Sequence, residues 1–229
     1  MTSLSAVKRI LMAPVFTLVL TGTLLVSSAV HAQQDEPVSA ATQAYLDGEF
    51  LAAHGLWRPL AEQGDPDAQT NLGILYRYGL GVVQDYAAAL LWYQLAADQG
   101  YPRGQFQLGL MHDYGLGVQQ NHLEAMRWYR ASATQGYVRA QFGMGALYGE
   151  GRGVPRNATE AAYWYRLAAE QGDANAQNIL GRMLESGEGV DQDPAEALHW
   201  FALAAEQDHV EAQENLQRVC QIQSDSNCP

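Results

Sequence analysis

Residues 68–103 read AQTNLGILYRYGLGVVQDYAAALLWYQLAADQGYPR, and the same pattern follows in residues 104–139, 140–175 and 176–211. A fixed period of 36 residues is typical of stacked repeats, in which each unit packs only on its neighbours. Both flanking segments contain parts of the pattern. We therefore expect an N-terminal partial repeat in residues 44–67, and a C-terminal capping helix and tail in residues 212–229.

Each copy predicts two helices joined by a glycine turn. In the first copy Ala68, Leu72 and Leu75 share one helical face. Gly79 is placed to end this helix in the left-handed conformation, and Asp85 is placed to cap the next one. In the other copies a glutamate follows the cap three residues later, which predicts a reciprocal capping box. The second helix would bury a shared set of small and aromatic residues: Ala89, Trp92, Tyr93, Ala96, Ala97 and their copies.

The N-terminal segment has the features expected of an export signal. Residues 1–32 combine Lys8 and Arg9 with an apolar run and the small-residue site Val30-His31-Ala32, which predicts a cleaved secretory signal peptide. An uncleaved anchor helix is the alternative, although the apolar run is at the short limit for spanning a membrane. Residues 33–43 are polar, and we expect them to form a mobile linker. The sequence thus predicts a periplasmic or secreted protein with no stable membrane insertion after cleavage.

The chain contains two cysteines, Cys220 and Cys228, and both lie close to the C-terminus. In an exported chain an even number of cysteines favours a disulfide, here one that closes a small loop. Two thiols without a nearby histidine are a poor metal site, so we predict a Cys220–Cys228 disulfide.

Composition argues against several partners and chemistries. The chain has 25 acidic and 13 basic residues and a formal net charge of −12, which disfavours nucleic acid and anionic membranes as partners. Lys8 is the only lysine, so the exported chain has none for Schiff-base or P-loop chemistry. We predict no catalytic residue, no cofactor and no metal site. The histidines of the exported chain lack metal-ligand spacing: His54, His112, His122, His199 and His209.

The motif resembles the Sel-one-like repeat family, a relative of the tetratricopeptide repeat. The resemblance implies an all-α, right-handed superhelix of antiparallel helix pairs. It also implies a non-catalytic role as a protein–protein interaction scaffold, often in exported bacterial proteins that act in envelope signalling, assembly or host contact. Weak hydrolytic activity is attributed to some relatives, so a small periplasmic hydrolase or cell-wall-active enzyme is the alternative. The resemblance rests on these residues of the first copy: Ala68, Leu72, Gly73, Tyr76, Gly79, Gly81, Val82, Asp85, Ala89, Trp92, Ala96, Ala97 and Gly100.

A partner surface is predicted on the first helix of each copy, because curved helical arrays usually expose this helix on their concave face. Its third, seventh and tenth positions change from copy to copy. Phe106, Leu110, Phe142 and Ala146 would form an exposed apolar stretch, although Phe106 and Phe142 could instead complete packing between repeats. The predicted residues that bind a protein or peptide are Thr70, Ile74, Arg77, Phe106, Leu110, Asp113, Phe142, Ala146, Arg182 and Glu185.

A glutamine occupies the second position of every copy, as in Gln69. A repeated polar residue can bond a neighbouring loop or contact a ligand backbone. We interpret it as structural, because ligand contacts usually vary between copies.

Overall fold

The computed structural model describes residues 39–223. The chain divides into two units, residues 1–37 and residues 38–229, and every described residue belongs to the second. The predicted signal peptide in residues 1–32 and the predicted disulfide partner Cys228 lie outside the described residues. Their roles stay predictions.

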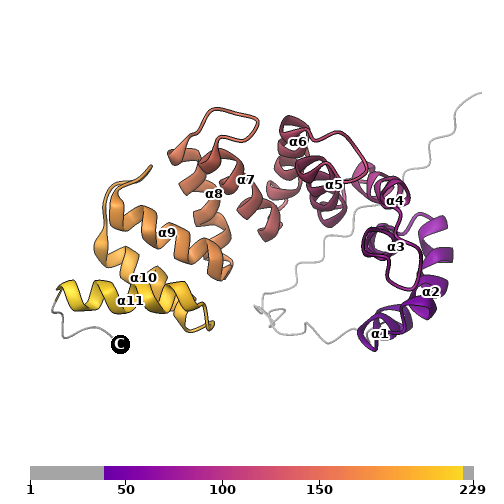
Figure 1. The fold of residues 1–229 in the computed structure, drawn as a ribbon, viewed down its shortest axis with the longest axis horizontal. Coiled ribbons are helices and arrows are strands. Elements are labelled where there is room, and N and C mark those ends of the chain that lie inside the picture. The colour runs from indigo at the N-terminus through magenta and orange to yellow at the C-terminus, as the bar shows by residue number, and fades with distance from the viewer. Residues whose placement is uncertain (1–38, 224–229) are drawn as a thin grey trace, which may run out of the picture. The chain divides into compact units, whose positions relative to one another are not determined.

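All regular secondary structure within residues 39–223 is α-helical, and each helix packs on the next one along the chain (Figure 1). Four helix pairs, α3/α4, α5/α6, α7/α8 and α9/α10, follow the repeated motif. The fold class, an all-α solenoid of antiparallel helix pairs, is therefore confirmed. The helices are α1 (Ala40–Leu46), α2 (Phe50–Glu62), α3 (Pro66–Tyr78), α4 (Tyr86–Asp98), α5 (Pro102–Tyr114), α6 (His122–Ala133), α7 (Val138–Glu150), α8 (Ala158–Glu170), α9 (Ala174–Ser186), α10 (Pro194–Ala205) and α11 (Val210–Gln223).

The linker expectation for residues 33–43 is wrong at its C-terminal end, because α1 begins at Ala40. The Ser39 hydroxyl caps this helix by accepting a hydrogen bond from the amide of Thr42 at 3.2 Å. Ala41 and Ala44 are buried in a core cluster that they share with residues of α2 and α3. The short helix thus covers the first end of the stack.

Two glycines shape each turn between the helices of a pair. Gly115 ends α5 in the left-handed conformation with φ of 67°, as its position predicts. Gly117 has φ of 70° and lies against the start of α4, where an added Cβ would be 2.6 Å from the Cβ of Tyr86. The second glycine therefore lets each turn rest on the preceding repeat.

The second helices begin at the predicted caps, but the reciprocal capping box is wrong. The Asn121 side chain accepts a hydrogen bond from the amide of Glu124 at 3.1 Å, as expected. The Glu124 carboxylate does not return the bond, because it pairs with Arg127 in the same helix. The backbone amide of Asn121 instead donates to the carbonyl of His112 at 2.8 Å, which ties α6 to the end of α5.

Helix pairs approach closely where a glycine of the first helix faces an aromatic ring of the second. Gly145 in α7 lies against Tyr165 in α8, and an added Cβ would be 2.7 Å from the ring. The predicted core is confirmed in its main members: the aromatic ring at this position is buried in all four pairs, as Tyr93, Tyr129, Tyr165 and Phe201, and so are the predicted alanines except for Ala205, which is half-buried. Trp128, Trp164 and Trp200 are also buried, whereas Trp92 is half-buried.

The repeated glutamines form a ladder of side-chain hydrogen bonds along the solenoid. The amide nitrogen of Gln141 donates to the carbonyl of Ala133 at 3.3 Å, and its amide oxygen accepts from Gln171 at 2.6 Å. Each rung therefore links one repeat to the helices on both sides, which confirms the structural interpretation. The equivalent pairs of rungs are Gln69 with Ala61 and Gln99, Gln105 with Ala97 and Gln135, and Gln177 with Ala169 and Gln207.

Candidate protein-binding surface

The ten predicted binding residues lie on the first helices α3, α5, α7 and α9, and we call them the variable surface. Three of them are buried: Thr70, Phe106 and Asp113. The Thr70 hydroxyl donates to the carbonyl of Pro66 at 2.8 Å, inside its own helix. The side chain at the third position of the first helix is therefore less exposed than the sequence predicted, as Thr70 and Phe106 show.

The expectation of an exposed apolar stretch is wrong for Phe106, whose side chain is 8% exposed. Its ring stacks on Tyr129 and packs on Tyr137, with ring centroids 5.6 and 5.4 Å apart. Phe142 is half-buried and meets the edge of Tyr165 at 5.5 Å. The alternative, that these rings complete packing between repeats, holds for Phe106. The seventh-position residues Ile74, Leu110 and Ala146 stay half-buried, and Arg182 is exposed.

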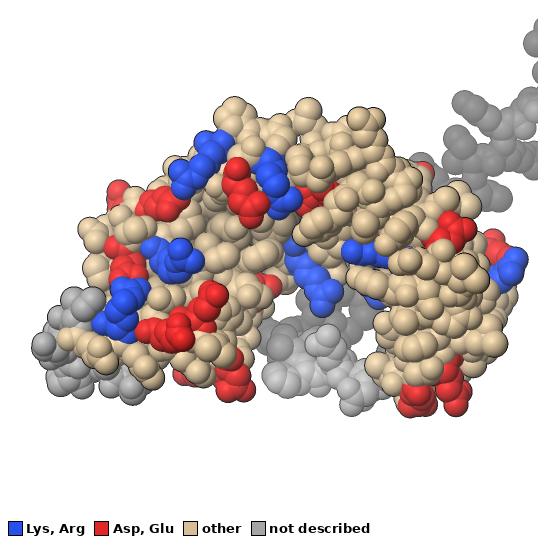
Figure 2. Space-filling view, viewed as in Figure 1, with Lys and Arg blue, Asp and Glu red and all other residues tan. Residues whose placement is uncertain are grey.

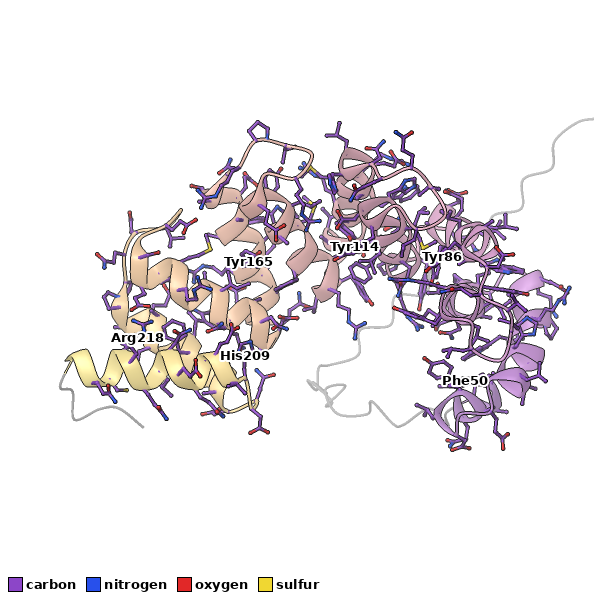
Figure 3. All side chains as sticks on the ribbon, in the orientation of Figure 1. Phe50, Tyr86, Tyr114, Tyr165, His209 and Arg218 are labelled. Atoms are coloured by element: carbon purple, nitrogen blue, oxygen red, sulfur yellow. The ribbon has the colours of Figure 1, made fainter. Side chains whose placement is uncertain are left out.

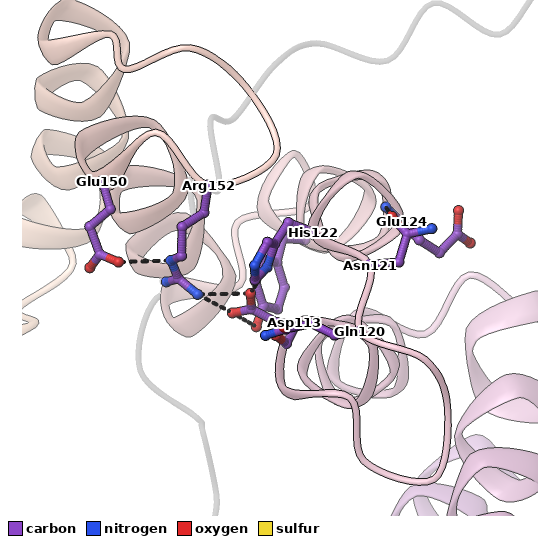
Figure 4. A network of polar contacts seen from close by, with 8 residues as sticks. Asp113, Gln120, Asn121, His122, Glu124, Glu150 and Arg152 are labelled. Atoms are coloured by element: carbon purple, nitrogen blue, oxygen red, sulfur yellow. Dashed lines mark hydrogen bonds and ion pairs between the residues drawn. The ribbon is translucent and has the colours of Figure 1, made fainter.

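A buried carboxylate joins the second and third repeats (Figure 4). Asp113 is 2% exposed and lies 2.8 Å from both Arg152 Nη1 and His122 Nδ1. The hydroxyl of Tyr129 donates to the other carboxylate oxygen at 3.3 Å. Arg152 comes from the turn after α7, and its Nε lies 2.7 Å from Glu150. Because the Asp113 carboxylate is surrounded by donors of its own chain, it serves the junction between repeats.

Arg182 and Glu185 line a pocket of about 460 Å³ at the C-terminal end of the variable surface. Its walls come from α7, α8, α9 and α11, and Figure 3 labels two of its residues, Tyr165 and Arg218. The Arg218 guanidinium donates to the Glu185 carboxylate from Nη1 and from Nη2, the latter at 2.7 Å. This hydrogen bond to Arg218 holds the pKa of Glu185 below its usual value.

A second hollow of about 350 Å³ lies between the first two repeats. Arg77 lines it together with Tyr86 and Tyr114, which Figure 3 labels. Arg77 is held by Gln107, whose amide oxygen accepts from Nη1 at 3.0 Å. The two hollows differ in volume and in their charged lining residues, so the variable surface presents unlike features at its two ends.

No three histidine, cysteine, aspartate or glutamate side chains within residues 39–223 gather closely enough to hold a metal ion. Burial lowers the pKa of His54 and of His112, which lie in different repeats. His54 bonds the Tyr76 hydroxyl at 3.1 Å, a contact between neighbouring helices. His54 therefore contributes to the packing of α2 on α3, and His112 is partly buried in a different repeat.

Charge on the visible face is mixed. Figure 2 shows arginines interspersed with acidic side chains, without one continuous basic patch on that face. Most arginines of the described residues pair with a carboxylate, as Arg166 does with Glu196. None of the helices in residues 39–223 has the length and apolar character needed to cross a membrane.

Four consecutive matches to the Sel1 repeat model cover residues 66–101, 102–137, 138–173 and 174–209. The chain belongs to the Sel1 repeat family. Each Sel1 repeat, as the model delimits it, begins with the first residue of α3, α5, α7 or α9, so the structural unit starts at residue 66 instead of 68. Proteins of the Sel1 repeat family are generally protein-interaction scaffolds.

Solved structures of Sel1 repeat proteins resemble this chain over most of the solenoid. It is 37% identical to a Sel1 repeat protein from Oxalobacter formigenes, with a TM-score of 0.72 over 80% of this chain and 75% of that one. It is 34% identical to c5321, described as a protective antigen of uropathogenic Escherichia coli, with a TM-score of 0.76 over 82% of this chain. The match spans 41% of the c5321 chain, so this chain covers less than half of that protein's length.

Of the residues that line the C-terminal pocket, sequence reasoning selected only Arg182 and Glu185; among those it missed are Gly149, Ala158, Tyr165 and Arg218. The signal that could have found them is the change from Asp113 and His122 in the second copy to Gly149 and Ala158 in the third. Cys220 is half-buried in α11, and its predicted pairing with Cys228 stays a prediction.

Proposed function

We propose that this protein is an exported, non-catalytic scaffold that binds a protein or peptide on the first-helix side of its Sel1 repeats. The observation that supports this proposal is that the residues shared by all repeats are buried or hydrogen-bonded within the stack, whereas a variable position is not. The shared residues form the core and the glutamine ladder, so their side chains contact other parts of the stack. The seventh position remains accessible and changes from Ile74 to Leu110, Ala146 and Arg182.

Photo-crosslinking at single positions tests this function. A benzoylphenylalanine in place of Leu110 or Ala146 is expected to crosslink a partner in extracts of the source cells. Leu91 is the matched control, because it is an apolar side chain of α4 that is 59% exposed on a second helix. The expected crosslink disappears when excess unlabelled protein is added. A partner that crosslinks equally through Leu91 would contradict the proposed surface.

Export is the second part of the proposal, and it rests on residues 1–32. Action in envelope signalling, assembly or host contact would follow from that location. Mass spectrometry of the protein from its own cells is expected to find an N-terminus after Ala32. Recovery of the intact chain from the cytoplasmic fraction would contradict export, and recovery of the intact chain from membranes would favour the anchor helix.

A further inference from the structure

The repeat geometry predicts an acidic partner for Arg182, and none of residues 39–223 supplies one. Arg182 and Arg218 are equivalent residues, 36 positions apart, in α9 and α11. Arg218 pairs with Glu185 of the preceding repeat. The residue that precedes Glu185 by the same 36 positions is Gly149, which has no side chain. No carboxylate of the described residues lies within ion-pair distance of Arg182.

The missing side chains leave a space. Asp113 and His122 fill the equivalent place in the second repeat, where Gly149 and Ala158 stand in the third. An added Cβ on Gly149 would lie 3.6 Å from the Cβ of Ala161, which is ordinary contact. Both small residues line the 460 Å³ pocket. A larger side chain could therefore stand at position 149, and its absence keeps the pocket open.

A hydrogen-bond donor lines the same space. Tyr129 donates its hydroxyl to Asp113 in the second repeat, but its equivalent Tyr165 has no acceptor among residues 39–223. Burial raises the pKa of Tyr165 to about 12, so its hydroxyl keeps its proton at neutral pH. Tyr165 lines the pocket with Arg182 and with the apolar side chains of Ile179 and Met183.

Among residues 39–223 no neighbouring carboxylate forms an ion pair with Arg182, although the charge of Arg182 contributes to lowering the pKa of Glu185. Glu185 is committed to Arg218 through two hydrogen bonds, and Glu188 is paired with Arg156. Each of these ion pairs is balanced within itself. Together with Arg156, which does not line the pocket, these residues carry three positive and two negative charges, and Arg182 is the arginine among them without an ion pair in the described part of the chain.

We propose that the C-terminal pocket binds an acidic side chain of a partner peptide. The carboxylate takes the place above Gly149 that Asp113 fills one repeat earlier. It accepts a hydrogen bond from Tyr165, pairs with Arg182, and brings its apolar neighbours against Ile179 and Met183. This inference rests on the proposed function and names the chemistry of the partner at one end of the variable surface.

Titration of the protein with short peptides, followed by amide and arginine NMR signals, tests the proposal. The probes are acetyl-Gly-Leu-Glu-Leu-Gly-amide, the same peptide with Gln in place of Glu, and the Gln peptide with a free C-terminal carboxylate. The Glu peptide is expected to move the signals of Gly149 and Arg182, and to bind about tenfold more tightly than the Gln amide. The third peptide separates a side-chain carboxylate from a C-terminal one.

Two variants probe the site with matched controls. Gly149→Glu supplies the carboxylate within the chain, so we expect it to pair with Arg182 and abolish binding while the melting temperature does not fall. Gly55→Glu adds the same charge to an exposed helical glycine and is expected to bind normally. Arg182→Gln is expected to weaken binding about tenfold, and Arg139→Gln, an exposed arginine of α7, is expected to have no effect.

The outcomes separate this inference from the scaffold function. Equal binding of the Glu and Gln amides, or normal binding by Gly149→Glu, would overturn the acidic-residue pocket. Tighter binding of the free C-terminus than of the Glu side chain would also overturn it. In each case crosslinking through Leu110 would still report whether the rest of the variable surface binds a partner.

Discussion

Replacing Gln141 with leucine removes two rungs of the glutamine ladder at once. The side chain is 4% exposed, donates to Ala133 and accepts from Gln171. A buried hydrogen bond contributes about 0.5–1.5 kcal/mol net, and the apolar burial of leucine offsets part of the loss. The carbonyl of Ala133 keeps a second hydrogen bond from Gly136, so it is not left unpaired. We expect a loss of about 1–2 kcal/mol in the free energy of unfolding.

Thermal unfolding followed by far-UV circular dichroism measures this loss. For a protein of this size, a loss of about 1–2 kcal/mol lowers the melting temperature by about 3–6 °C. Gln213→Leu is the matched control, because the Gln213 side chain is exposed at the end of the ladder and, within residues 39–223, its one side-chain hydrogen bond is the 3.3 Å bond to the carbonyl of Ala205. Its expected cost is below about 0.5 kcal/mol. If Gln141→Leu proves as mild as Gln213→Leu, the ladder does not stabilise the stack.

Three further predictions concern packing, a buried charge and pH. Gly145→Ala should lower the free energy of unfolding by about 1–3 kcal/mol, because the added Cβ would lie 2.7 Å from the Tyr165 ring. Gly143→Ala is the control and should cost less, because its nearest ring atom, in Tyr129, is 3.3 Å away. Urea unfolding measures both. Asp113→Ala should cost about 2–4 kcal/mol in the same assay, because it leaves Arg152 Nη1 and His122 without their buried carboxylate, and combining Asp113→Ala with Arg152→Met should recover part of the loss. The Arg218 pair lowers the pKa of Glu185 in the folded protein, so its stabilisation is present above the usual glutamate pKa and is lost as pH falls through the lowered value. Melting curves between pH 6 and pH 3 should therefore show a smaller loss for Glu185→Gln than for the unchanged protein, by under about 1 kcal/mol because the pair is partly exposed.

The fold could be predicted from sequence because each repeated residue makes its contacts within one pair or with the next. Ala68, Leu72 and Gly79 have the same surroundings in every copy, so a pattern that recurs in register reports the structure directly. The glutamine of the second position is the clearest case, because a polar residue that is shared by all copies has a shared partner.

The candidate site was harder to predict, because its features depend on differences between copies. Phe106 looks exposed on a helical wheel, yet Tyr137 at the start of the next pair covers it. The capping box failed at Glu124 because Arg127 competes for the carboxylate. Predicting the pocket would have required two facts: that position 149 and position 182 of the next repeat line the same space, and that residue 149 is a glycine. Only the first of these needs the three-dimensional structure.

The glutamine ladder also bears on how such a chain can change in length. Every repeat donates one amide to the helix before it and offers one oxygen to the helix after it, so the glutamine ladder stays continuous when a whole 36-residue unit is duplicated or deleted. Duplication of a repeat then preserves the glutamine hydrogen bonds between neighbouring helices, while the accessible residues of each new copy can change. An extended version of this protein could acquire additional recognition elements one module at a time.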